Sequence, residues 1–130
     1  MTPAPSDVLV VDDDPDLMEL VRVMVATSGY EVRCASNGRE AIQRVEEKRP
    51  AVVLLDMLMP VMDGWQCARE LRKRYGHDVA IVVVTAAEHA RARAEEIDGD
   101  DVLSKPFEMD DLLRVVARYA PKKKPDVPTS

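Results

Sequence analysis

Apolar residues along the chain fall into five short runs rich in β-branched side chains, separated by stretches with helical spacing. The runs are Val8–Val11, Tyr30–Cys34, Ala51–Leu55, Val79–Val84 and Val102–Ser104. The third and fourth runs are apolar without interruption, which is typical of central strands in a parallel sheet that is covered on both faces. The pattern therefore predicts five strands, two of them deeply buried.

The stretches between the runs predict helices. From Leu17 onward, apolar residues stand at i, i+3, i+4, i+7 and i+8, which makes one apolar stripe. Asp14 suits the N-cap of this helix, Pro15 its first position and Gly29 its end. Residues 37–40 resemble a capping box at the start of a second helix.

Three further helices are expected. One contains Trp65 to Tyr75, and the last contains Leu112 to Tyr119. The stretch from Glu88 to Ile97 has only a thin apolar face, so we expect a helix that packs less firmly than the others. Five strands alternating with five helices predict right-handed crossovers and an α/β, doubly wound sheet.

Polar and charged residues follow four of the five predicted strands. Asp12 and Asp13 follow the first strand, Asp56 the third, Thr85 ends the fourth and Lys105 follows the fifth. The carboxyl ends of parallel strands lie at one edge of a sheet, where ligands bind. Clustered carboxylates without Cys or His favour Mg²⁺ or Mn²⁺, and a carboxylate beside such a cation can attack phosphorus. A lysine and a hydroxyl would supply the charge and the donor that phosphoryl oxygens need.

Composition excludes several classes of protein. A length of 130 residues suits one domain, and a net charge of −6 argues against a free-standing DNA binder. No apolar stretch approaches the ~20 residues of a membrane-spanning helix, and residues 1–6 carry no signal-peptide pattern. Cys34 and Cys67 are too few for a disulfide scaffold and are expected to be reduced, buried thiols. We therefore expect a cytoplasmic protein without direct contact to nucleic acid or membrane.

Four motifs carry a resemblance to a known family: Val8–Pro15, Leu54–Gly64, Val82–Ala86 and Lys105–Phe107. From about Val8 to Tyr119 the chain resembles a response-regulator receiver domain, the phosphorylatable module of bacterial two-component signalling, of the stand-alone chemotaxis-regulator kind. The resemblance implies a flavodoxin-like (βα)5 three-layer sandwich with parallel strand order 2-1-3-4-5. In that order the strand before Asp12 lies beside the strand of Asp56.

The resemblance also implies a metal site. Asp56 would be the phosphoacceptor, and Asp13 and Asp56 would bind Mg²⁺ directly. Asp12 would assist through water, and the backbone carbonyl of Leu58 would complete the protein ligands.

Further residues have roles by the same resemblance. Lys105 would pair with the phosphoryl group or, before phosphorylation, with Asp56, and Thr85 would close onto a phosphoryl oxygen after transfer. Ala86 is small, as the reacting phosphorus requires beside it, and the Lys105–Pro106 bond would be cis.

Simpler interpretations stand beside these assignments. Asp14 is better explained as a helix cap than as a metal ligand. Thr85 could cap the following helix, and Lys105 could be a surface lysine. His77 and His89 are expected in loops or on the surface, since nothing supplies either with a nucleophile.

The chain departs from the family pattern near the expected switch. Val102 occupies the position three before Lys105 where most members carry an aromatic residue, and a valine cannot make the same burial switch. Asp98 stands where a glycine is usual, and the interval from Thr85 to Lys105 is about two residues shorter than is common. We expect the fourth helix or its flanking loops to be shortened.

Two other departures concern the lifetime of the phosphoryl group. Leu58 and Ala87 lie two residues after Asp56 and Thr85, where the family tunes the approach of the attacking water. Apolar side chains offer no hydrogen bond to that water, so we predict slow self-dephosphorylation.

The sequence divides into residues 1–6 as an N-terminal extension, residues 7–120 as the receiver domain and residues 121–130 as a basic, proline-rich tail. The expected partners are a sensor histidine kinase or phosphotransfer protein and an unidentified output protein. Residues 95–111 contain eight acidic residues and only one basic residue, Lys105, so the output partner is expected to be basic.

Other functions stay open at this point. The chain could be a receiver-like binding module that works without phosphorylation, or the receiver part of a longer hybrid kinase or regulator. An aspartyl phosphatase is disfavoured, because such enzymes usually carry a second acid where Leu58 stands. We therefore expect a signalling receiver that catalyses only its own phosphorylation and slow dephosphorylation.

Overall fold

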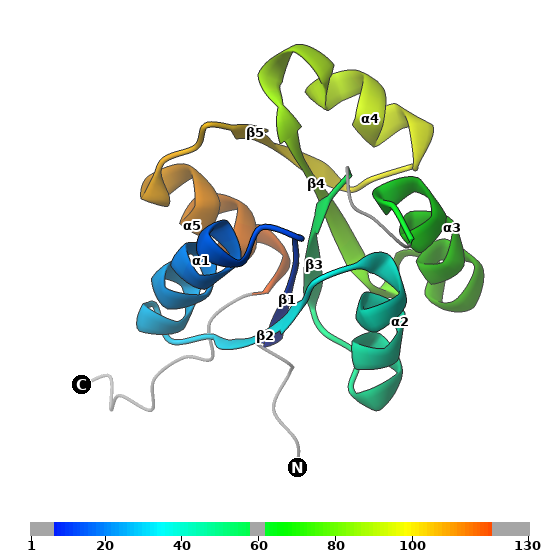
Figure 1. Ribbon diagram of the computed structural model, residues 1–130, viewed down its shortest axis with the longest axis horizontal. Coiled ribbons are helices and arrows are strands. Elements are labelled where there is room, and N and C mark those ends of the chain that lie inside the picture. Colours follow the sequence, from blue (N-terminus) through cyan, green and yellow to red (C-terminus); the bar gives the residue numbers. More distant parts are fainter. Residues whose placement is uncertain (1–6, 58–61, 121–130) are drawn as a thin grey trace.

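The computed structural model describes residues 7–57 and 62–120, apart from the side chains of Ala87 and Ala90 (Figure 1). The strands are β1 (Asp7–Val11), β2 (Glu31–Ala35), β3 (Val52–Asp56), β4 (Ala80–Ala86) and β5 (Asp101–Lys105). The helices are α1 (Pro15–Thr27), α2 (Gly38–Glu47), α3 (Gly64–Tyr75), α4 (Ala90–Glu96) and α5 (Met109–Tyr119). The 3₁₀ turns η1 (Gly76–Asp78) and η2 (Ala87–His89) flank β4. The expected extension and tail lie outside the described residues.

The five strands form one parallel sheet in the order β2-β1-β3-β4-β5, which confirms the predicted fold class. In Figure 1, α1 and α5 lie on one side of the sheet and α2, α3 and α4 on the other. The strand order brings β1 and β3 together although 40 residues separate their ends, Val11 and Val52. The two strands that precede the acidic residues are therefore neighbours.

Alternation along the strands divides the core into two layers. One set of side chains, with Leu9, Leu55 and Ile81 among them, packs against α2, α3 and the end of α4. The other set packs against α1 and α5. Every residue of β1 and β3 is buried, which for β3 confirms the prediction from the uninterrupted run Ala51–Leu55. Cys67 is buried as expected, whereas Cys34 is only partly buried.

Helix caps follow the sequence with one correction. The Asp14 side chain accepts hydrogen bonds from the backbone N–H groups of Asp16 and Leu17, and so caps α1. Asn37 caps α2 by accepting from the N–H of Glu40 at 2.8 Å. The predicted capping box is only half formed. The Glu40 carboxylate should accept from the N–H of Asn37, but it accepts from the N–H of Ser36, one residue before the cap.

The weakly patterned stretch near residue 90 forms a short helix. The turn η2 precedes α4, which has seven residues and is the shortest of the five α-helices. Its packing rests on Ala94 and on Ile97, which directly follows it. Asp98 then adopts a φ of 54°, a left-handed conformation that glycine takes more readily. Among the helices of the described residues, none is long and apolar enough to cross a membrane.

Candidate phosphoacceptor and metal site

The candidate site lies at the carboxyl edge of the sheet. Asp12 and Asp13 follow β1 directly, and Asp56 is the last residue of β3. Register places Val11 beside Leu55, so the acids that come next on the two strands are brought together. Backbone hydrogen bonds hold both strand ends: Asp12 N–H donates to Ala35 O at 3.1 Å, and Gly64 N–H donates to Met57 O at 3.0 Å.

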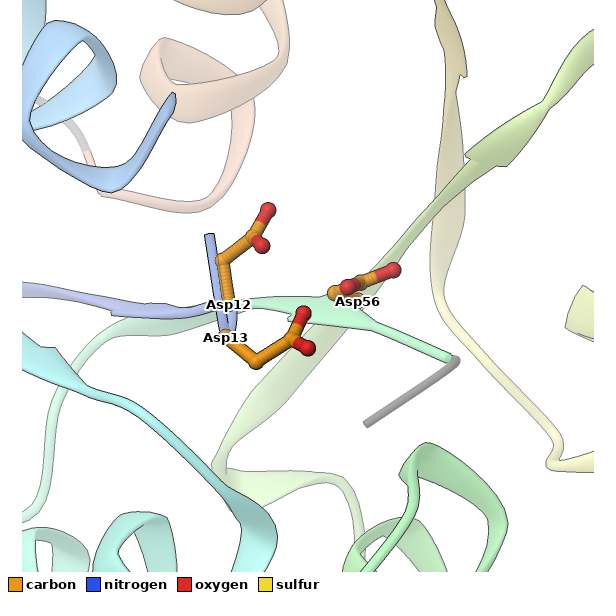
Figure 2. A group of neighbouring side chains, drawn as sticks. All are labelled: Asp12, Asp13 and Asp56. Atoms are coloured by element: carbon orange, nitrogen blue, oxygen red, sulfur yellow. The ribbon is translucent and has the colours of Figure 1, made fainter. Parts of the chain in front are cut away.

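The three carboxylates form a compact cluster (Figure 2). One oxygen from each of Asp12, Asp13 and Asp56 lies within 4.8 Å of the others. Asp12 and Asp56 are buried, with 5% and 7% of their surface exposed, while Asp13 is exposed. Carboxylates at this spacing repel one another unless a proton or a cation lies between them.

Burial raises the pKa of Asp12 above its ordinary value of 3.8. A hydrogen bond from Asp14 N–H to the Asp12 carboxylate, 2.9 Å long, and the charge of Lys105 oppose this shift. The charges of Asp13 and Asp14 add to it. The site therefore holds negative charge in a place where water solvates it poorly, which favours an added cation.

Lys105 supplies one positive charge from β5. Its Nζ lies 3.7 Å from Asp56 Oδ1 and 3.8 Å from Asp12 Oδ2, and its side chain is one-third exposed. Both distances exceed a hydrogen bond, so the ammonium balances the two carboxylates through space. The Lys105–Pro106 peptide bond is cis, the geometry that the resemblance leads us to expect.

Thr85 and Ala86 end β4 next to this lysine. Register pairs Ala86 with Lys105 and Thr85 with Ser104. Thr85 is buried with 9% of its surface exposed, and Ala86 is half-buried. The residues predicted from β1, β3, β4 and β5 are thus delivered to the same edge of the sheet.

The donor set of the acidic cluster fits a hard divalent cation. Three carboxylate groups offer oxygen ligands within the spacing of one ion, and no Cys or His belongs to this group. Mg²⁺ prefers such ligands and keeps some of its own water, which the exposed position of Asp13 allows. The expected fourth contact, the Leu58 carbonyl, lies outside the described residues.

A model of the response-regulator receiver domain matches residues 8–117. The chain belongs to this family. Accepting a phosphoryl group is the general function of receiver domains, and they bind a divalent metal through a cluster of aspartates. They are signalling modules that interact with sensor kinases and output domains.

Relatives of this receiver domain are themselves response regulators. The response regulator MprA of Mycobacterium sp. (strain KMS) is 38% identical over 130 residues, covering 95% of this chain and 56% of the relative. MprA of Mycobacterium leprae is 37% identical, covering 92% and 53%. The chain thus spans little more than half the length of these relatives.

Solved structures resemble the receiver domain over most of its length. Chemotaxis protein CheY4 of Vibrio cholerae is 29% identical with a TM-score of 0.79, covering 89% of this chain and 99% of its own. The response regulator TrrA of Thermotoga maritima, solved in complex with Mg²⁺–BeF, is 34% identical with a TM-score of 0.79, covering 87% and 97%.

Val102, at the position of the expected aromatic switch, lines a groove. Val102 is partly buried against the core, and together with Arg91, Glu95, Gly99 and others it lines a hollow of about 630 Å³ between α4 and β5. Valine leaves this hollow open where a ring could lie. The side chain of Ala87 lies outside what the structure describes.

The acidic stretch of the sequence is less negative in the fold than its composition suggests. Five of its eight acids, Glu96, Asp98, Asp100, Asp101 and Asp111, form ion pairs with Arg93, His77, Arg72, Arg118 and Arg114. A basic output partner remains a prediction, with fewer unpaired acids to meet it.

Sequence reasoning missed the role of His77. This residue is on the surface as expected, but its ring lies between two carboxylates, with Nδ1 2.9 Å from Asp100 and Nε2 2.8 Å from Asp98. Arg72 joins the group by donating to Asp100 Oδ2 and to Asp98 O. No local pattern marks this cluster, because Arg72 and His77 lie more than 20 residues before the two acids.

Proposed function

We propose that Asp56 of this chain accepts a phosphoryl group from the phosphohistidine of a sensor kinase or phosphotransfer protein. The observation that carries the proposal is the meeting of Asp12, Asp13, Asp56 and Lys105 at one edge of the sheet. This set provides a nucleophile, the ligands of a divalent cation and a counter-charge, which are the parts that phosphoryl transfer requires.

In the proposed step a carboxylate oxygen of Asp56 attacks the phosphorus of the donor. The new O–P bond forms as the P–N bond to the donor imidazole breaks, and the imidazole leaves with the electron pair of that bond. A bound divalent cation, Mg²⁺ or Mn²⁺, would offset the charge of the carboxylates and of the phosphoryl oxygens. Asp13 and Asp56 would hold it directly, with Asp12 assisting.

Lys105 and Thr85 are proposed to hold the product. Lys105 already faces Asp56 at 3.7 Å, so its ammonium can follow the charge to the phosphoryl oxygens. Thr85 offers a hydroxyl donor at the end of the neighbouring strand. Ala86 leaves room beside the reacting phosphorus because its side chain ends at Cβ.

The output is proposed to be a change in a partner-binding surface. Phosphorylation adds a charge of about −1.5 to −2, which redistributes the hydrogen bonds of Thr85 and Lys105. That change biases a two-state surface formed by α4, β5 and α5. Shifting such an equilibrium from mostly off to mostly on requires a preference of roughly 5 kcal/mol.

The decisive experiment is labelling with acetyl phosphate in the presence of Mg²⁺. Mass spectrometry of the intact protein should show one added phosphoryl group, which chelation of the metal prevents. Asp56→Asn should abolish labelling, whereas Asp110→Asn, an exposed acid in the first turn of α5, should not. Labelling of the Asp56→Asn variant at full extent would refute the assignment.

One observation favours a second candidate, a binding module that does not need phosphorylation. Val102 cannot make the burial switch that an aromatic side chain makes, and the groove beside it is already open. The two candidates differ in whether partner binding survives Asp56→Asn. We further propose residues 7–120 as the receiver unit, whether it works alone or in a longer hybrid kinase or regulator.

A further inference from the structure

Most arginines of the protein are neutralised within the chain. Those with an acidic partner in an ion pair are Arg22, Arg33, Arg44, Arg49, Arg72, Arg74, Arg93, Arg114 and Arg118. A protein with a net charge of −6 has enough carboxylates for such pairing. An arginine without one is therefore an exception that needs a physical account.

Two of the exceptions share one groove. Arg39, in the first turn of α2, and Arg69, in the middle of α3, line a hollow of about 340 Å³ between these helices. Figure 1 shows α2 and α3 side by side on the same face of the sheet. Both arginines are exposed, and neither forms an ion pair with any described residue. The groove also has Met62 and Gln66 in its wall.

The nearby carboxylates are engaged elsewhere. Glu70, which lines the same groove, pairs with Arg74 at 3.3 Å. Glu40 accepts hydrogen bonds from Ser36. Asp63 accepts the N–H of Gln66 at 3.0 Å and so caps α3. These acids are thus committed to Ser36, to the cap of α3 and to another arginine.

The far end of the same helix pair is different. There Arg74 of α3 pairs with Glu46 of α2, so charge is balanced across the two helices. Arg39 in the first turn of α2 and Arg69 in the middle of α3 have no such partner among the described residues, and Lys73 adds an exposed positive charge one turn after Arg69. The unpaired positive charge of the α2–α3 surface therefore lies at the groove and along α3 beyond it.

We propose that this groove docks an acidic segment of a partner protein. Guanidinium groups bind carboxylates in a planar, two-bonded geometry, and two of them on one hollow suit side chains that carry neighbouring carboxylates. Met62 offers an apolar contact beside them, and Gln66 can donate or accept a hydrogen bond. The chain's own basic tail carries Lys122–Lys124, and like charge excludes it as the occupant.

The net charge decides between a peptide and a nucleic acid. A long polyanion would meet repulsion from the acidic remainder of the surface, whereas a short acidic segment contacts only the groove. The docking surface lies outside the cluster of Asp12, Asp13 and Asp56. Failure of phosphoryl transfer at Asp56 would therefore leave this proposal standing, and the reverse also holds.

The test is a titration of the ¹⁵N-labelled protein with an acetylated, amidated hexaglutamate peptide, followed by NMR. We expect saturable shifts confined to residues 38–43 and 62–70. The double variant Arg39→Gln/Arg69→Gln should weaken binding about tenfold, because two exposed charge pairs are lost. Raising the salt concentration from about 0.05 to about 0.3 M should weaken it as well.

A matched control separates this groove from general charge effects. Arg91 also has no ion pair with a described residue, but it lines the α4–β5 groove together with Glu95 and Asp98. Arg91→Gln should leave the affinity for the peptide unchanged, and Asp56→Asn should also leave it unchanged. Shifts that do not saturate, shifts centred on α4 and β5, or tighter binding of a short single-stranded DNA than of the peptide would each overturn the proposal.

Discussion

The indole nitrogen of Trp65 donates a 2.8 Å hydrogen bond to Glu96, which joins the first turn of α3 to the last turn of α4. Arg93 completes the contact, with its guanidinium 5.0 Å from the centre of the indole ring and 3.2 Å from Glu96. Since α3 begins eight residues after Asp56, this contact ties the region of the phosphoacceptor to the shortest of the five α-helices.

Replacing Trp65 by Phe should loosen α4. The substitution removes the donor to Glu96 but keeps an aromatic face for Arg93, so α4 loses its bond to α3 without losing its own core contacts. We expect several-fold faster hydrogen exchange over residues 90–96, measured by mass spectrometry, and a pKa of Glu96 that returns toward its ordinary value. Tyr75→Phe, at the other end of α3, should leave this exchange unchanged; equal rates in all three proteins would show that the contact does not hold α4.

His77 should make stability depend on pH. Hydrogen bonds to Asp100 and then Asp98 raise the pKa of His77 above its ordinary value of 6.5, against the opposing charge of Arg72. The stabilisation is fully present below pH 6.5 and is lost as the pH rises through the raised pKa of the folded protein. Urea unfolding from pH 6 to pH 9 should show this decline, and His77→Gln should flatten it. A decline of the same size in the variant would assign the effect to another group.

A divalent cation should stabilise the protein through the acidic cluster. A ligand bound only by the folded state at one hundred times its dissociation constant adds about 2.7 kcal/mol to the free energy of unfolding. Added Mg²⁺ should therefore raise the melting temperature, and Asp13→Asn should remove most of the rise because it deletes one of the three carboxylates. Asp110→Asn keeps the cluster intact and should respond like the unaltered protein. An undiminished rise in Asp13→Asn would place the ion elsewhere.

Gly64→Ala should displace the backbone at the end of β3, where Asp56 lies. A Cβ at this position would lie 2.6 Å from Met57 Cα and 2.9 Å from Asp56 O, which are backbone atoms that cannot turn aside. We expect a loss of about 1–3 kcal/mol in the free energy of unfolding and slower labelling of Asp56. Gly99→Ala is the milder comparison, since its nearest neighbour is a side-chain atom, Val83 Cγ2, at 3.0 Å. Equal losses in both variants would contradict the backbone clash.

Slow loss of the phosphoryl group is predicted from two apolar residues that follow Asp56 and Thr85 in the sequence. Leu58 and Ala87 offer no hydrogen bond to an attacking water, so a double variant with Asn at both positions should lose the group several-fold faster. The half-life of the labelled protein after removal of acetyl phosphate measures this. A half-life of the unaltered protein no longer than that of the double variant would defeat the prediction.

Much of the fold follows from local patterns in the sequence. The uninterrupted run Ala51–Leu55 became β3, a strand buried on both faces, and Asp14 and Pro15 became the cap and first residue of α1. Element ends were predicted less well: β2 begins at Glu31 rather than at Tyr30. The Glu40 side chain does not complete the expected box, because Ser36 offers it both a backbone N–H and a hydroxyl donor.

By itself, the sequence determined which residue types stand at the ends of the strands. The apolar pattern of each strand predicts its length and burial, and so identifies the residues that follow it. Only the tertiary structure decided which of these residues meet. It placed Lys105 between Asp12 and Asp56 and brought Trp65 to Glu96. It also grouped His77 with two acids and left Arg39 and Arg69 without an ion pair among the described residues. The physical reason is that periodicity reflects interactions between near neighbours in the chain. A charge pair across tens of residues depends instead on how helices settle on the sheet, which no single segment encodes.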